Sequence, residues 1–99
     1  MPDSGLTIAH NVAQRRFEVR GEGTLAHCDY RLDGTVLQLV HTEVPAALGG
    51  RGIAAGLVAA ALAWARAEGF SVIPVCSYVR TYMRRHPETS DLLVDGVAT

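Results

Sequence analysis

Residues 41–69, HTEVPAALGGRGIAAGLVAAALAWARAEG, join an expected strand to a long alanine-rich helix through a loop of glycines. Gly49, Gly50 and Gly52 precede the helix, and no Ser, Asp or Asn is placed to cap its first turn. The leading backbone N–H groups of the helix therefore lack a side-chain partner, and they lie at the positive end of the helix dipole. Because glycines also let the backbone approach a ligand closely, this junction predicts a binding site for an anion such as phosphate.

Alternating apolar and polar residues predict four antiparallel strands before the glycine loop. From Ala26 to Leu32 the even-numbered residues are apolar and the odd-numbered ones polar, so one face of that strand is expected to be solvated. Asp33-Gly34 is typical of a two-residue hairpin turn. The expected strands are residues 6–12, a segment around Phe17 and Val19, residues 24–32 and residues 36–44.

After the glycine loop, the apolar spacing predicts a helix from about Gly50 that ends at Gly69, a C-terminal stop of the Schellman kind. The next strand, residues 71–76, should run parallel to residues 36–44, because a helix connects the two. Pro74 cannot donate a ladder hydrogen bond, so it predicts an edge position or a divergence of neighbouring strands. A divergence would open a cleft at the C-terminal strand ends, where α/β sheets commonly bind ligands.

A second, short helix is expected from Tyr78 to Arg85, capped by Ser77 and ended by His86-Pro87, with a further short element around residues 91–94. The predicted fold class is therefore mixed α/β (α+β). It combines an antiparallel meander, one β-α-β crossover and a short C-terminal helix in one domain spanning residues 1–99.

Charge and composition exclude several function classes. The net charge of −1 gives no general attraction to nucleic acid or to acidic membranes. Neither a run of eighteen apolar residues nor a basic, apolar leader is present, so we expect a soluble cytoplasmic protein without a membrane partner. The 2 cysteines, Cys28 and Cys76, are too few for a disulfide scaffold, and without Cys or His pairs at ligand spacing we expect no metal site.

The stretch GGRGIAA at residues 49–55 resembles the acyl-CoA pyrophosphate loop of the GCN5-related N-acetyltransferase (GNAT) superfamily. The superfamily form is Arg or Gln, two residues, Gly, one residue, then Gly or Ala. Gly52 and Ala54 match its last two positions, whereas Gly49 stands where Arg or Gln is usual. With IPVCSYV and YMRRHPE as further matching stretches, residues 5–94 resemble the minimal GNAT-related family of N-acetyltransferase-domain proteins of about this length.

This resemblance implies acetyl-CoA as the cofactor. Its pantetheine arm is expected beside the strand near Thr42 and Val44, with Tyr78 and Arg85 as further contacts. The alternative for the loop is a glycine-rich turn without a ligand. Arg80, Arg84 and Arg85 form a basic helix face, with Arg51 as a further candidate, that could receive the cofactor's 3′-phosphate or an acidic partner; the alternative is that they are solvated surface arginines. The pyrophosphate is expected on the backbone of the loop residues Gly49, Gly50, Arg51, Gly52, Ile53, Ala54 and Ala55.

Acyl transfer to an amine needs a neutral nucleophile, and an ammonium must therefore lose a proton before attack. Glu43 is the candidate general base, acting through water, and its alternative role is a solvated carboxylate at a strand end. His41 points to the same face as Glu43 in a regular strand, so it could be the base or the orienter of Glu43. A polar core histidine is the alternative role of His41.

The departing thiolate needs a proton, and Tyr82 lies where the superfamily often has a tyrosine for this purpose, with Tyr78 as a substitute one turn earlier. Both could instead be core residues. Cys76 ends the parallel strand at the cleft and could accept the acyl group transiently, or be a buried inert thiol. Cys28 lies on an apolar strand face and is expected in the core.

The predicted function is acetyl-CoA-dependent N-acetyltransfer by direct attack of an unidentified amine, on a small molecule or on a protein or peptide. Larger GNAT proteins wall their acceptor site with extra helices and strands for which 99 residues have no room, so an open acceptor site is expected. A regulatory module that binds CoA or acetyl-CoA with little or no catalysis is the main alternative, favoured by Gly49 and the missing walls. A scaffold without a cofactor is the third. The sequence does not predict the oligomeric state.

Overall fold

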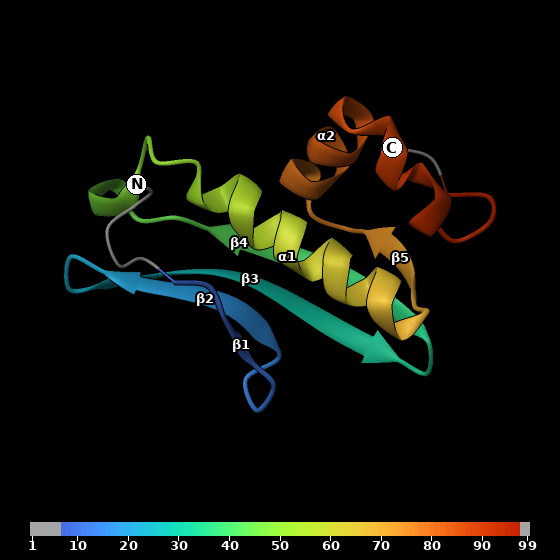
Figure 1. Cartoon of the computed structure of the whole chain (residues 1–99), viewed down its shortest axis with the longest axis horizontal. Helices are drawn as coiled ribbons and strands as arrows, with labels where there is room; N and C mark the ends of the chain where they lie inside the picture. The colour runs from blue at the N-terminus through green and yellow to red at the C-terminus, as the bar shows by residue number, and fades with distance from the viewer. Residues whose placement is uncertain (1–6, 98–99) are drawn as a thin grey trace.

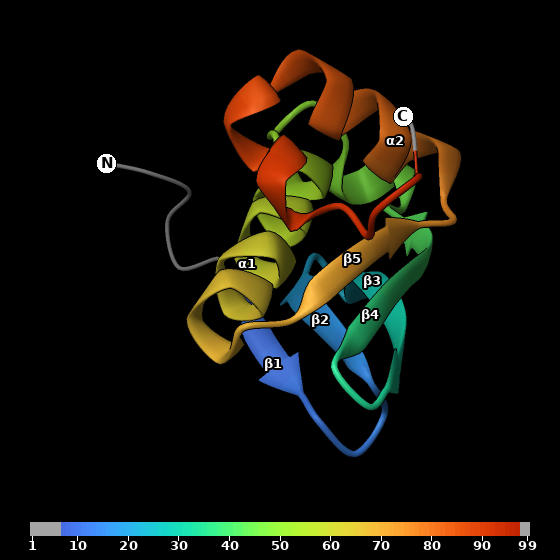
Figure 2. The ribbon, with the colours of Figure 1, turned by 90° about the vertical axis from the view of Figure 1, so that its right-hand side faces the viewer.

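The computed structural model describes residues 7–97, in which a five-stranded sheet carries two α-helices on one of its faces (Figure 1, Figure 2). The strand order is β1-β2-β3-β4-β5, antiparallel except for the parallel pair of β4 and β5. This arrangement confirms the predicted fold class. The elements in chain order are β1 (Ala9–Asn11), β2 (Arg16–Gly21), β3 (Thr24–Asp33), β4 (Val36–Glu43), η1 (Ala46–Leu48), α1 (Ile53–Glu68), β5 (Ser71–Pro74), α2 (Ser77–Arg85) and η2 (Pro87–Leu92).

One hydrophobic core fills the space between the sheet and the helices. Phe17, Val19 and Tyr30 point into it from the sheet and are each no more than 5% exposed. Fully burying one aliphatic side chain stabilises the fold by about 1.5–3 kcal/mol, so the apolar stripe of α1 is sufficient to hold this helix against the strands. The stripe consists of Ile53, Leu57, Val58, Ala61, Leu62 and Ala65.

The opposite sheet face, called the open face below, bears no helix among residues 7–97 (Figure 2). Its polar side chains come from alternate positions of the antiparallel strands, as expected for a sheet with one solvated face. On β3 these are His27 and Asp29, and on β2 they are Arg16, Glu18 and Arg20.

Glycine conformations fix both ends of α1. Gly52 caps the N-terminus in the left-handed region (φ 70°) without a side-chain cap, as the sequence predicts. Gly69 is left-handed as well, and the N–H groups of Gly69 and Phe70 donate to the carbonyls of Arg66 and Ala65. This is the predicted Schellman arrangement.

A β-bulge interrupts the pairing of β3 with β4. Tyr30 pairs with Leu39 and Asp29 pairs with His41, so Val40 is one extra residue on β4. Because side chains alternate along a strand, the bulge turns His41 to the open face, although Leu37 and Leu39 point into the core.

Some predicted local details are wrong. Ser77 does not cap α2, because it is already the first helical residue and Cys76 holds the N-cap position. The final strand ends at Pro74 rather than at residue 76, and η2 with a single bridge between Val72 and Leu93 replaces the element expected at 91–94. The first strand is three residues long, and Leu6 lies outside the described residues.

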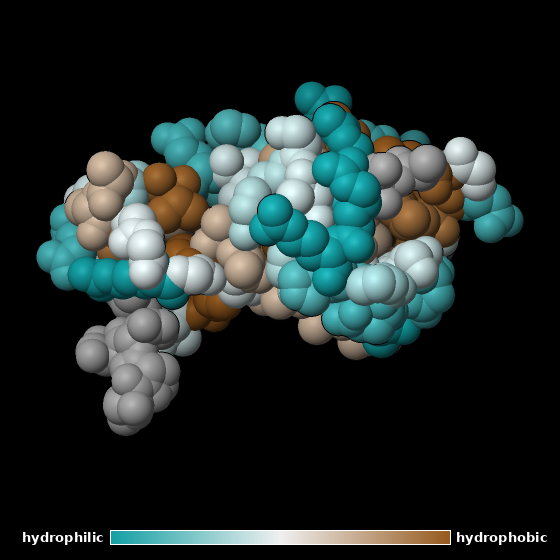
Figure 3. Space-filling view, turned by 90° about the horizontal axis from the view of Figure 1, so that it is seen from above, coloured by the Kyte–Doolittle hydropathy of each residue, from teal (hydrophilic) through white to brown (hydrophobic). Residues whose placement is uncertain are grey.

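Within the described part of the chain, no helix is long and apolar enough to cross a bilayer. From the side of α2, hydrophilic side chains cross the middle of the surface and hydrophobic ones gather in separate patches toward its two ends (Figure 3). One of these patches lies at the end of the molecule that carries η1 and the glycine loop.

Candidate functional site

A gap opens in the sheet where β5 ends before β4. The parallel pairing stops at Leu39 and Pro74, whereas β4 continues to Glu43 with β3 as its neighbour. The N–H of Cys76 donates to the carbonyl of Leu39 (2.9 Å), and the chain then turns away into α2. Residues 40–43 therefore present a free backbone edge, called the sheet gap below, and Pro74 marks its start as predicted.

The glycine loop follows β4 through Pro45 and η1, so it lies at the same end of the sheet as the gap (Figure 1). Gly50 and Gly52 are both left-handed, and the N–H groups that begin α1 donate to no capping side chain. An added Cβ at Gly49 would stand 3.2 Å from the carbonyl oxygen of Ala46. The glycine thus lets η1 fold back against the loop at the position where the family usually has Arg or Gln.

Arg51 is exposed in this loop and forms an ion pair with Glu22 of the β2–β3 turn (3.4 Å). On α2, the Arg80 guanidinium donates to the carbonyls of Pro74 and Val75 (3.3 and 2.7 Å). Arg85 is exposed near the end of α2.

Thr42 lies on the core face of the gap between the two thiols. The Cys76 thiol donates to the Thr42 hydroxyl (3.7 Å), which donates to the Cys28 sulfur (3.6 Å). Burial raises the pKa of Cys28 to about 11, as expected for an inert core thiol. Burial also acts to raise the pKa of Cys76, but hydrogen bonds from the backbone of Val79, from Thr42 and from the backbone of Tyr78 outweigh it, so this pKa is lowered.

The tyrosines of α2 differ in their surroundings. Tyr82 is half-buried and stacks on His86, with ring centroids 4.0 Å apart. Burial, followed by the charge of Glu88 and by Tyr78, raises the pKa of Tyr82, which favours its protonated form. Tyr78 lies one turn earlier and is 38% exposed.

His41 and Glu43 lie together on the open face. Their Nε2 and Oε1 atoms are 3.2 Å apart, and their side chains are 55% and 60% exposed. The alternative role of His41 as a core histidine is therefore wrong, and its physical reason is the bulge at Val40. The chain thus separates Thr42 and Cys76 on the core face from His41 and Glu43 on the open face, with the gap between the two groups.

The polar residues beside this pair belong to no motif in the sequence. His27 and Asp29 of β3 form a 2.8 Å contact and lie directly across from Glu43 and His41. The sequence indicated only that they are polar residues on the solvated face of the strand predicted over residues 24–32. Glu18 was also missed, because no local pattern shows that a strand carboxylate will be 4% exposed.

Comparison with known proteins decides the family. Residues 16–92 match the sequence profile of the family described as GCN5-related N-acetyl-transferase. The chain belongs to this family. Protein NATD1 of Xenopus tropicalis is 35% identical over 89 residues, which cover 87% of the chain and 82% of that relative. Protein NATD1 of Mus musculus is 35% identical over 85 residues, covering 83% of the chain and 77% of that relative.

A solved structure extends the likeness to the fold of this GNAT domain. The solution structure of a GCN5-like candidate N-acetyltransferase from Staphylococcus aureus superposes with a TM-score of 0.73 at 26% identity, covering 93% of the chain and 91% of the other. The predicted GNAT fold is confirmed, and the protein is a GNAT-type acyltransferase. The roles of individual residues in this GNAT domain stay predictions.

Proposed function

We propose that the protein transfers an acetyl group from acetyl-CoA to a primary amine by direct attack of the amine. The proposal rests on two backbone segments at one end of the sheet, one without a capping side chain and one without a partner strand. The uncapped N-terminus of α1 suits a pyrophosphate, and the free edge of β4 suits an extended amide-containing arm.

The residues present fit acetyl-CoA. The N–H groups of residues 50–55 would hold its pyrophosphate, because two left-handed glycines leave no side chain over them. The backbone of Thr42 and Val44 would pair with the pantetheine amides, while Tyr78 and Arg85 would contact the cofactor from α2. When bound, acetyl-CoA supplies an acetyl thioester whose C–S bond breaks as the C–N bond to the amine forms.

Side chains of β4 and α2 divide the two proton transfers. Glu43 or His41 takes the proton that the attacking ammonium must lose. Tyr82 gives a proton to the departing sulfur, and its raised pKa keeps that proton available at neutral pH. The backbone of β4 beyond its pairing with β5 would donate to the oxyanion that develops on the carbonyl.

Cys76 supports a second route, because its pKa is lowered and its sulfur lies beside Thr42 at the gap. In this route the Cys76 thiolate would attack the thioester and CoA would leave as its thiolate; the neutral amine would then attack the acetylated Cys76, form the amide and release the Cys76 thiolate. Retained transferase activity in Cys76→Ala would exclude an obligatory acetyl-cysteine. Loss of activity together with a trapped acetylated Cys76 in the native chain would exclude direct transfer.

Titration calorimetry with acetyl-CoA, followed by a transfer assay on a panel of amines, tests the proposal. We expect binding and transfer, with loss of transfer in Glu43→Gln and Tyr82→Phe but unchanged binding. Glu68→Gln, an exposed carboxylate on α1, is the matched control. Binding without transfer to any amine would favour the regulatory module, and no binding at high micromolar acetyl-CoA would refute both the enzyme and the regulatory module.

The two free thiols, Cys28 and Cys76, further suit a reducing cytoplasm.

A further inference from the structure

Four side chains on the open face form a rectangle of acids and bases, called the quartet below. His27 faces Glu43 and Asp29 faces His41 across the β3–β4 pair. Within each strand the histidine contacts the acid two residues on, at 2.8 Å on β3 and 3.2 Å on β4. The two imidazole centroids are 6.0 Å apart on the diagonal.

The hydrogen-bonding properties of carboxylates and imidazoles show which atoms of the quartet have no partner within it. An ionised carboxylate only accepts, so the ring nitrogen that touches it must carry the proton. In the neutral form of each ring, Nε2 of His27 and Nδ1 of His41 are therefore left as proton acceptors. Asp29 and Glu43 each keep a second oxygen. The quartet thus offers several acceptors, matching the three N–H donors of a primary ammonium.

The β4 half of the quartet, His41 and Glu43, borders the sheet gap. His41 and Glu43 flank Thr42, whose hydroxyl points the other way and touches Cys76. Because β5 does not cover this part of β4, the free edge connects the open face with the core-side thiol. An amine held above His41 and Glu43 therefore lies over β4, and only this strand separates it from the free edge.

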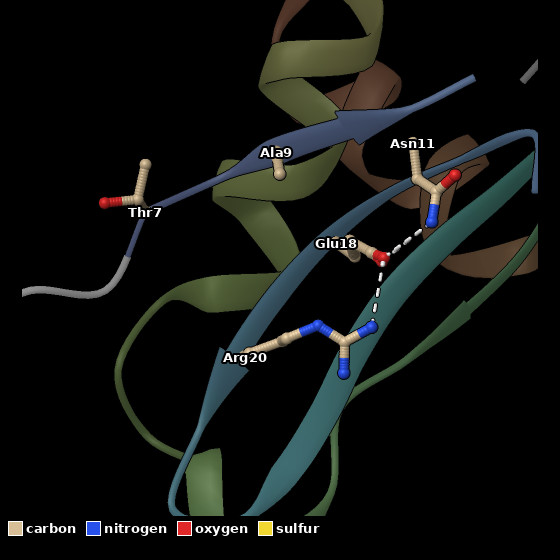
Figure 4. Close-up of a pocket in the computed structure, with 5 residues that line it drawn as sticks. All are labelled: Thr7, Ala9, Asn11, Glu18 and Arg20. Atoms are coloured by element: carbon tan, nitrogen blue, oxygen red, sulfur yellow. Dashed lines mark hydrogen bonds and ion pairs between the residues drawn. The ribbon is translucent and has the colours of Figure 1, made fainter. Parts of the chain in front are cut away.

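A hollow of about 500 Å³ lies on the same face, and Figure 4 shows the residues that line it. Glu18 lines it and pairs directly with His27 in the β2–β3 register. The Glu18 carboxylate is 5% exposed and accepts hydrogen bonds from Asn11 (3.0 and 3.3 Å), while Arg20 reaches it at 3.8 Å. This fixed polar wall gives the body of a small acceptor a place next to the quartet.

We propose that His27 and Asp29 complete an acceptor subsite with His41 and Glu43 on the open face, and that this subsite selects amines in their ammonium form. The inference rests on the proposed function and deepens it. The carboxylates hold the ammonium, and His41 Nδ1 then takes one of its protons. The neutral amine attacks the acetyl carbonyl at the gap. His27 and Asp29 act as positioning residues.

Histidine side-chain NMR tests the subsite without catalysis. The chain has 4 histidines, and two of them serve as internal controls. His10 stacks on Phe17 in the core (4.1 Å) and His86 stacks on Tyr82 (4.0 Å). On titration with n-butylammonium chloride, the ring signals of His27 and His41 should shift saturably, whereas His10 and His86 stay constant.

Matched probes and variants decide the outcome. n-Butanol and sodium chloride should leave all four signals unchanged. Asp29→Asn and Glu43→Gln should each weaken butylammonium binding by about fivefold, the scale of one exposed ion pair. Asp29→Glu, which keeps the carboxylate, should bind almost as the native chain does. Glu68→Gln should have no effect on binding. No shift at His27 and His41, or an equal shift with butanol or sodium chloride, would overturn the proposal.

Kinetics separate the subsite from the proposed function. With an amine that is acetylated, Asp29→Asn and His27→Gln should raise the KM for that amine and leave the KM for acetyl-CoA unchanged. An unchanged amine KM in both variants would refute their positioning role. If acetyl-CoA does not bind at all, the proposed function fails, and the histidine shifts still decide whether the open face binds an ammonium.

Discussion

Replacing Thr42 by Val should raise the pKa of Cys76. The hydroxyl is 3.7 Å from the Cys76 sulfur and can rotate its proton toward the thiolate once that forms. A hydrogen bond to a charged group contributes about 1.5–3 kcal/mol. This contact is long, and backbone N–H groups of α2 remain as donors to the sulfur, so we expect a loss at the lower end of that energy range. Such a loss corresponds to a rise of about one unit in the pKa of Cys76.

The assay is alkylation of the folded protein by iodoacetamide over a range of pH, with the site read by mass spectrometry. Cys76 of the native chain should titrate below an ordinary thiol, whereas Cys28, with a pKa of about 11, should stay unmodified. Thr42→Ser keeps the hydroxyl and is the control. At neutral pH the Thr42→Val rate should fall by only about fourfold, because a more basic thiolate is a better nucleophile.

An unchanged Cys76 midpoint in Thr42→Val would refute the reasoning that this hydroxyl stabilises the thiolate. A native midpoint at or above that of an ordinary thiol would refute the lowered pKa itself, and with it the physical argument for the acetyl-cysteine route.

Other predictions concern stability, measured by urea unfolding. Gly52→Ala should lower the free energy of unfolding by about 1–2 kcal/mol, because Gly52 is left-handed, whereas Gly56→Ala within the same helix should raise it by about 0.5–1 kcal/mol. Equal effects of the two would contradict the cap assignment. Leu57→Ala, at a fully buried position, should cost about 2–5 kcal/mol. The hydrogen bond from Asn11 lowers the pKa of Glu18, and the charges of nearby arginines lower it further. The ionised carboxylate therefore stabilises the fold at pH values above the ordinary pKa of Glu. This stabilisation is lost as the pH falls through the lowered pKa of Glu18. Glu18→Gln should flatten that part of the pH profile, and an unchanged profile would contradict the shift.

Much of the fold could be predicted because its signals are local. Alternation in residues 24–32 shows a half-buried strand, Gly69 ends its helix by a backbone conformation that glycine adopts easily, and Pro74 excludes a central ladder position. The same local chemistry predicted an uncapped helix start among Gly49, Gly50 and Gly52, and the structure has its N-cap at Gly52.

The two faces of the candidate site could not be predicted, because they depend on pairing between distant residues. The bulge at Val40 arises from the β3–β4 register and reverses the alternation expected for a regular strand. A regular strand would have put His41 in the core with Leu39. The partnership of His27 with Glu43 depends on the same register, and Ser77 failed as a cap because the helix begins one residue earlier than its composition indicates.

The most direct test of the account is an acetyl-CoA titration followed by backbone amide NMR. We expect saturable shifts in two groups of amides, Ile53 to Ala55 at the start of α1 and Val40 to Val44 along the sheet gap, with small shifts in the β1–β2 turn. Gly52→Ala should weaken the binding. Saturable binding whose shifts avoid both groups, or no binding at high micromolar concentration, would contradict the claim that this strand, loop and helix form an acyl-CoA site.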